Sequence, residues 1–103
     1  MWAQLITTKL KAGREGDLPR LEEAIRRAEQ PDSGLVRSLM MQDQSDPSRA
    51  YMLVIFESEA HARARESDPR RQEALQAGRE LMGEIFDGAP EFTDLTVVEE
   101  FVP

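Results

Sequence analysis

Cysteine and asparagine are both absent from this chain of 103 residues, and histidine, tryptophan and tyrosine each occur once. The missing cysteines exclude disulfides, thiolate catalysis and zinc or iron–sulfur sites that use sulfur ligands. The lone histidine excludes a metal site that takes several histidines from one chain. We therefore expect neither a bound metal nor any other cofactor.

Long apolar segments are missing as well. No apolar run approaches the roughly 20 residues that a helix needs to span a bilayer. The first residues, Met1 to Gln4, lack the basic flank and apolar stretch of a signal peptide, so we expect a cytoplasmic protein with no membrane partner. With 40% apolar and 32% charged residues, the composition is that of a globular chain. The length suits one hydrophobic core, and we predict a single domain over residues 1–103.

Basic residues are absent after Arg79, whereas seven of the acidic residues lie from Glu80 onward. The formal net charge of −7 therefore belongs to this last segment, because the preceding residues carry 13 basic and 13 acidic side chains. A nucleic-acid-binding protein needs a basic surface that neutralises phosphates. The one arginine-rich stretch, residues 63–71, has acids interleaved and is typical of a solvated helix face. We expect no nucleic acid partner.

The rest of the sequence alternates between strand and helix patterns. Strand segments are rich in apolar and β-branched residues, helical segments repeat apolar residues every three or four positions, and Gly, Pro and Asp mark the boundaries. We expect Asp17, Ser58 and Asp68 to cap helices. The expected order is strand, helix, strand, strand, helix pair and strand, over residues 2–11, 18–30, 35–41, 50–56, 59–65, 69–86 and 92–101.

This order predicts an α+β, ferredoxin-like fold, in which a four-stranded antiparallel sheet carries its helices on one face. The strand at residues 50–56 is apolar on both faces, with Tyr51, Leu53 and Ile55 alternating with Met52, Val54 and Phe56. Leaving three such side chains in water would forgo roughly 1.5–3 kcal/mol each. We therefore predict a homodimer that pairs through the open sheet face. The alternatives are a sheet that curls enough to shield its own outer face, or a position at a sheet edge for one of these side chains.

Several short turn and cap sequences occur in a fixed order along nearly the whole chain. They are Leu10-Lys11-Ala12-Gly13-Arg14-Glu15 after the first strand, Gly34-Leu35 opening the second, Asp46-Pro47-Ser48-Arg49 in the hairpin loop, and Phe56-Glu57-Ser58-Glu59-Ala60 running into Ala62-Arg63-Ala64. In this order and spacing they resemble the antibiotic biosynthesis monooxygenase-like family, part of the dimeric α+β barrel superfamily. The resemblance implies the ferredoxin-like dimeric α+β barrel.

The family that the chain resembles is similar in scaffold and divided in activity. Some relatives are cofactor-independent oxygenases of polyketide quinones, some degrade haem, some act on quinols, and many have no known activity. Haem-degrading and quinone-oxidising relatives depend on an asparagine in the pocket, and this chain has none. Many relatives also carry a histidine just after the proline that begins the second long helix, where this chain has Arg70 and Arg71.

Four side chains are candidates for a functional site. His61 is the only group that titrates near neutrality without help, which suits acid–base catalysis, although a surface histidine explains it too. Trp2 and Tyr51 are suited to stacking on a flat ligand or donating a hydrogen bond, or else cap the core. Arg37 suits the binding of an acidic group if it points inward, and otherwise protects a sheet edge.

Two hypotheses for the function follow. The first is a cofactor-independent monooxygenase-like protein that acts on or binds a small aromatic or quinol-type molecule, with Tyr51 and Arg37 stabilising the substrate and Trp2 stacking on its ring. The second is a non-catalytic dimer that binds a small apolar or aromatic ligand or regulates a partner. A pocket that is open between sheet and helices favours a ligand, whereas an interior filled by leucine and methionine excludes one.

Overall fold

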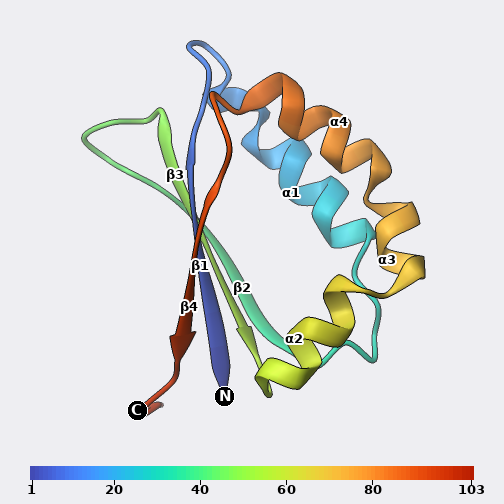
Figure 1. Ribbon diagram of the computed structural model, residues 1–103. Coiled ribbons are helices and arrows are strands. Elements are labelled where there is room, and N and C mark those ends of the chain that lie inside the picture. Colours follow the sequence, from blue (N-terminus) through green and yellow to red (C-terminus); the bar gives the residue numbers. More distant parts are fainter.

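The computed structural model describes all 103 residues and contains one antiparallel sheet with every helix on the same side (Figure 1). The strands are β1 (Trp2–Lys9), β2 (Leu35–Gln42), β3 (Arg49–Phe56) and β4 (Glu91–Thr96), in the spatial order β2-β3-β1-β4. The helices are α1 (Leu18–Arg27), α2 (Glu59–Glu66), α3 (Pro69–Ala74) and α4 (Gln76–Ile85), with a 3₁₀ turn η1 (Glu15–Asp17) before α1. This arrangement confirms the predicted α+β ferredoxin-like fold.

The strand register decides which side chains face the helices. Trp2 pairs with Phe56 and Thr8 pairs with Ala50, without interruption between them. Because successive residues of a strand point to opposite faces, the two central strands send alternate side chains toward the helices. Those of β1 and β3 on the helix face are Trp2, Gln4, Ile6, Thr8, Ala50, Met52, Val54 and Phe56. Tyr51, Leu53 and Ile55 therefore belong to the open face.

The core consists of two separate hydrophobic clusters at opposite ends of the sheet. One contains Leu10, Leu18, Leu21, Ala50 and Ile85, and the other contains Trp2, Val54, Phe56 and Ala62. The first attaches α1 and α4 to the sheet, and the second attaches α2. Between the two ends no fully buried cluster joins the helices to the strands.

The N-caps expected at Ser58 and Asp68 are confirmed, since each side chain accepts a hydrogen bond from a backbone N–H two or three residues later. Pro69 occupies the first helical position after Asp68. The cap expected at Asp17 is wrong. The chain already turns helically through η1, so Asp17 has helical backbone angles, and its carboxylate accepts hydrogen bonds from Arg14 and Arg20 instead.

Two strands end earlier than the sequence predicts. The last strand was expected to reach residue 101 but ends at Thr96, which pairs with Trp2, the first residue of β1. Beyond it only the N–H of Val97 reaches back, donating to the carbonyl of Met1 at 3.3 Å. The first strand ends at Lys9, and Leu10 makes only an isolated bridge with Phe86. The second helical region is divided at Leu75, where the chain bends so that Gly78 packs against Leu75 and Ala24. None of the helices has the length and apolarity to cross a membrane.

Candidate functional site

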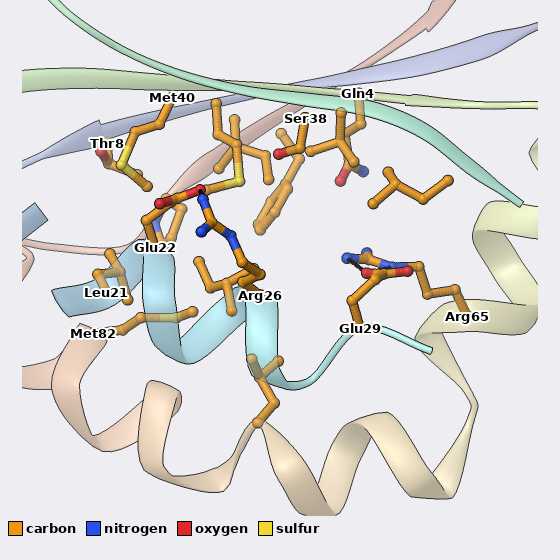
Figure 2. Close-up of a pocket in the computed structure, with 18 of the residues that line it drawn as sticks. Gln4, Thr8, Leu21, Glu22, Arg26, Glu29, Ser38, Met40, Arg65 and Met82 are labelled. Carbon is orange, nitrogen blue, oxygen red and sulfur yellow. Dashed lines mark hydrogen bonds and ion pairs between the residues drawn. The ribbon is translucent and has the colours of Figure 1, made fainter. Parts of the chain in front are cut away.

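A cavity of about 620 Å³ lies between the helix face of the sheet and the helices (Figure 2). It exists because the two core clusters hold the helices at the two ends of the sheet and leave the middle unfilled. Pockets of roughly 300–1,000 Å³ are typical of small-molecule sites in proteins. The interior is therefore open enough for a ligand, and it is not closed by leucine and methionine.

The cavity wall is mainly apolar. Of its 28 lining residues, 17 are hydrophobic. Three methionines, Met40, Met52 and Met82, line it from the sheet and from α4, and Figure 2 shows Met40 and Met82 on opposite walls. Their flexible thioether side chains adapt to ligands of irregular shape.

Three polar side chains reach the cavity from the sheet. Thr8 Oγ1 donates a hydrogen bond to the carbonyl of Ala50 at 3.0 Å, and Gln4 Nε2 donates to Asp94 at 3.0 Å. Ser38 makes no side-chain hydrogen bond within the protein and lies on the sheet wall in Figure 2. Its hydroxyl is therefore free to bind a ligand group.

Charged side chains occupy the helix side of the cavity. Arg26 Nη2 donates to Glu22 Oε1 at 2.7 Å, and Figure 2 shows both side chains extending from α1 into the space. Arg65 donates to Glu29 Oε2 through Nε at 2.9 Å and through Nη2 at 2.7 Å. The Arg65–Glu29 pair is the most buried ion pair of the protein, with side-chain exposures of 11% and 22%. It ties α2 to the segment that follows α1.

Arg71, on α3, also lines the cavity. Burial lowers the pKa of its guanidinium, and the nearby positive charge of Arg65 lowers that pKa further. Its Nε atom is buried and has no hydrogen-bond partner. Arg71 is thus a half-buried cation beside the Arg65–Glu29 pair, with one buried donor unpaired.

Of the sequence-predicted site residues, Trp2 and Tyr51 line the cavity, and Trp2 does so from the helix face of the sheet. It is buried, its ring centroid lies 6.2 Å from that of Phe56, and the guanidinium of Arg63 lies 5.0 Å above its ring. Arg63 is held by Asp94 at 2.9 Å. The pKa of Asp94 is lowered first by the hydrogen bond from Gln4 and then by Arg63. This contact joins β4 to α2 at one end of the cavity.

The structure does not bring Tyr51 and Arg37 to Trp2. Tyr51 borders the cavity between Ala50 and Met52, but it is paired with residues of the open face, Thr7 and Met41, and its side chain belongs there. Arg37 is exposed on the edge strand β2, paired with Ile55 and next to a register irregularity. Strand alternation turns both side chains toward the open face, and a shared role of Tyr51 and Arg37 with Trp2 stays an untested prediction.

His61 lies outside the cavity, at the start of α2. Its Nδ1 is 2.6 Å from Ser58 Oγ, and its Nε2 is 3.4 Å from Glu57 Oε2. The ring lies against Gly34, where a Cβ atom would come within 2.4 Å of His61 Cδ2. These contacts belong to the helix cap and the neighbouring turn. They do not place His61 beside the other candidates.

Four lining residues were not predicted from the sequence: Arg65, Glu29, Arg71 and Ser38. Arg65 and Arg71 belong to the arginine-rich stretch that was interpreted as a solvated helix face. A signal was nevertheless present. Ala62 is the buried residue of α2, and Arg65 follows it by three positions, so both share the inner face of the helix. No group of three or more histidine, aspartate or glutamate side chains comes together in a way that could hold a metal ion.

Comparison with protein-family models and with curated proteins finds no match. The fold, in contrast, is shared with solved structures. A protein from Bordetella bronchiseptica aligns with 95% of this chain and 97% of its own, with a TM-score of 0.74 and 20% identity. One from Deinococcus radiodurans aligns with 100% of this chain and 98% of its own, with a TM-score of 0.73 and 17% identity.

Both proteins are provisionally named antibiotic biosynthesis monooxygenases. A protein of unknown function from Nitrosomonas europaea is similar to the same degree, with a TM-score of 0.72 and 19% identity over 99% of this chain and 93% of its own. The ferredoxin-like fold of the single chain, which the turn and cap sequences predicted by resemblance, is therefore confirmed. At these identities the shared feature is the fold.

Proposed function

We propose that this protein binds a small aromatic or quinol-type molecule in the cavity between its sheet and its helices. The observation that carries the proposal is the cavity itself, about 620 Å³ in volume and lined mainly by apolar side chains. Apolar walls with a few well-placed polar groups are the usual composition of a small-molecule site. Trp2 is the aromatic residue that we propose as a stacking contact, since its side chain lines this cavity and its partner Phe56 is buried.

The test uses N-phenyl-1-naphthylamine, an uncharged aromatic dye that fluoresces when it leaves water. We expect saturable binding to the whole protein. The variant Ser38→Trp places a large side chain on the cavity wall and should abolish this binding, whereas Gln44→Trp, in the exposed loop after β2, should preserve it. Equal binding by both variants would reject the cavity as the site.

Oxygenation of the bound molecule is the second candidate function. The shared fold with proteins provisionally named monooxygenases favours it. A cofactor-independent oxygenase needs a dry pocket and groups that stabilise an electron-rich substrate anion. The apolar wall supplies the first requirement, and Arg26, Arg65 and Ser38 are the groups suited to the second.

Oxygen uptake with a panel of hydroquinones and anthrones tests the activity. We expect uptake above that of heat-denatured protein, loss of it in Ser38→Trp, and unchanged uptake in Tyr51→Phe and Arg37→Ala. Dye binding without uptake on any compound of the panel would leave the non-catalytic binding protein as the function. Loss of uptake in Tyr51→Phe would instead show that the open face takes part.

We also propose that two copies pair through the open sheet face. Central residues of this face, such as Leu53, are half-buried within one subunit, but Leu39, Met41 and Leu95 remain 40%, 41% and 39% exposed. Leu39 and Met41 lie on the edge strand β2, and Leu95 lies on the opposite edge strand β4. Their register partners are on β3 and β1, so all three belong to the open face of the sheet. A second copy covers such a face economically, since closed two-fold pairs are the commonest oligomers.

A further inference from the structure

Arg71 is a cation without a counterion inside the protein. Its Nε atom is buried with no hydrogen-bond partner, and its guanidinium takes part in none of the protein's ion pairs or side-chain hydrogen bonds. A buried donor that is left unsatisfied is costly, and native proteins pair almost all of them. A partner that arrives with a ligand would explain why this one is free.

The charges around Arg71 do not supply that partner. The acid beside it, Glu29, already accepts two hydrogen bonds from Arg65. Glu66, which also lines the cavity, is already paired with Arg63 at 3.2 Å. Arg79, which also lines the cavity, donates only to the carbonyl of Gln72 and has no acidic partner.

Positive charge therefore exceeds negative charge on the cavity wall. The lining contains four arginines, Arg26, Arg65, Arg71 and Arg79, and three glutamates, Glu22, Glu29 and Glu66. This excess occurs in a protein whose formal net charge is −7. Burial and the neighbouring Arg65 both disfavour the charged form of Arg71 and lower its pKa, and an anionic group beside the guanidinium would favour that form again.

The cavity also has a polar and an apolar end. Figure 2 shows the Arg65–Glu29 pair at one end and Leu21, Met40 and Met82 toward the other, where Thr8 and Glu22 also lie and Glu22 is neutralised by its pair with Arg26. A ligand that matches both ends has an apolar body and a charged head. Arginine suits such a head, because its planar fork of donors matches the oxygens of a carboxylate or a similar oxyanion.

We propose that the ligand of this cavity is an aromatic or apolar molecule with an anionic oxygen group, and that Arg71 binds this group. The proposal rests on the proposed function, because it assumes that the cavity holds a ligand. Arg65 keeps Glu29 as its partner and adds a second positive charge near the head. The apolar end receives the body of the molecule.

Two dyes that differ only by one anionic sulfonate group test the inference. 8-Anilinonaphthalene-1-sulfonate carries a sulfonate, and N-phenyl-1-naphthylamine is the same molecule without it. We expect the sulfonate dye to bind the whole protein more tightly than the neutral one. In Arg71→Met, which keeps an apolar stem and removes the charge, the sulfonate dye should bind about tenfold more weakly or worse, while the neutral dye keeps its affinity.

Two further variants serve as controls. Arg27→Met removes the same charge from the exposed face of α1, where Arg27 pairs with Glu23, and should leave the affinities for both dyes unchanged. Arg71→Lys keeps the positive charge and should recover part of the lost affinity. Circular dichroism of each variant checks that its helices are retained before the affinities are compared.

The outcomes separate this inference from the proposed function. If both dyes bind equally well and Ser38→Trp abolishes both, the cavity holds ligands but the anionic head is rejected. If neither dye binds, the proposed function fails first. If Arg27→Met weakens the binding of the sulfonate dye as much as Arg71→Met does, the affinity is decided by the net charge of the protein and not by Arg71. That result would reject the inference.

Discussion

At the scale of single residues, Gly34 has the strictest requirement in the chain. Its φ of +79° lies in the left-handed region, and a Cβ atom there would lie 2.4 Å from His61 Cδ2. The histidine ring thus occupies the space that a side chain at position 34 would need. The same turn precedes β2, and its carbonyl accepts a hydrogen bond from the N–H of Glu57 at 2.9 Å.

We expect Gly34→Ala to lower the free energy of unfolding by about 1–3 kcal/mol, because it combines a strained backbone with a steric clash. Urea denaturation followed by circular dichroism measures the change. Gly83→Ala is the matched control, since Gly83 lies in α4 with open space around it. That substitution should stabilise the protein by roughly 0.5–1 kcal/mol. A Gly34→Ala variant as stable as the wild type would contradict the packing of His61.

Asp68 gives a pH dependence of stability. The side-chain hydrogen bond from Arg70 is the main cause that lowers its pKa from the ordinary value of 3.8. Since the folded state holds the ionised form more tightly than the unfolded state does, this stabilisation is present above pH 3.8 and is lost as the pH falls through the lowered pKa.

We therefore expect Asp68→Asn, which retains a capping oxygen, to lose less stability than the wild type on acidification below pH 4 or thereabouts, the ordinary range of an Asp carboxyl. Thermal melts across a pH series measure the difference. In an Arg70→Met background the same substitution should change the acid dependence less, because the main cause of the shift is gone. An equal effect in both backgrounds would show that Arg70 is not the cause.

The candidate residues show where prediction from sequence ends. Ser58 and Asp68 were recognised as caps because a cap depends on neighbours within three residues. The residues that line the cavity with Trp2 depend instead on which side chains of different strands point to the same face of the sheet. Tyr51 differs from Met52 by a single position, and that position decides between the open face and the cavity. That Arg71 lacks an ion-pair partner depends on how α2, α3 and the end of α1 pack together, which the sequence does not show.

At the scale of elements, α2 decides how the cavity is closed. Ala62 packs into the cluster around Trp2 and Phe56, and Arg65, on the same side of the helix, lies over the Phe56 ring at 5.2 Å while it binds Glu29. The order of strands and helices was predictable from the sequence, because hydrophobic periodicity depends only on residues close together in the chain. The ion pair between α2 and the end of α1 was not, because Arg65 and Glu29 are 36 positions apart.

Glu29→Gln should destabilise the protein by about 1–3 kcal/mol, because it leaves the nearly buried Arg65 without a charged partner. Chemical denaturation measures the loss. Glu23→Gln is the comparison variant, since Glu23 pairs with Arg27 on the exposed face of α1. An exposed pair of this kind contributes less than about 1 kcal/mol. Equal losses of stability in the two variants would mean that the Arg65–Glu29 pair stabilises the protein no more than an exposed ion pair does.

At the scale of the whole molecule, the core is small for the surface that the fold presents. Only 13 of the 103 residues are buried, and the helix face holds a cavity in place of a continuous core. Val98, Phe101 and Val102 follow β4 and are 94%, 81% and 75% exposed. Figure 1 shows this tail leaving the sheet on the side away from the helices. Apolar side chains therefore gather on the open side of the molecule, where the second copy is proposed.

Phe56 is unsuitable for testing this pairing by mutation, because its side chain is buried inside the subunit. Phe56 is 3% exposed and packs with Trp2 under the helices, so changing it would damage the subunit itself. Leu39 is the better position, because it is exposed on the edge strand β2 and lies opposite Leu53 at the centre of the open face. A charge introduced there would remain in water in a single subunit but would be buried between two sheets in a pair.

We expect sedimentation of the wild type at micromolar concentration to give twice the chain mass of 11.7 kDa. Leu39→Glu should shift the mass toward that of one chain while circular dichroism shows the helices and strands retained, because an unpaired charge buried in an interface costs several kcal/mol. Gln44→Glu adds the same charge in the exposed loop after β2 and should leave the pair intact. A wild type that sediments as one chain would reject the pairing, and a Leu39→Glu protein that stays paired would move the interface away from the open face.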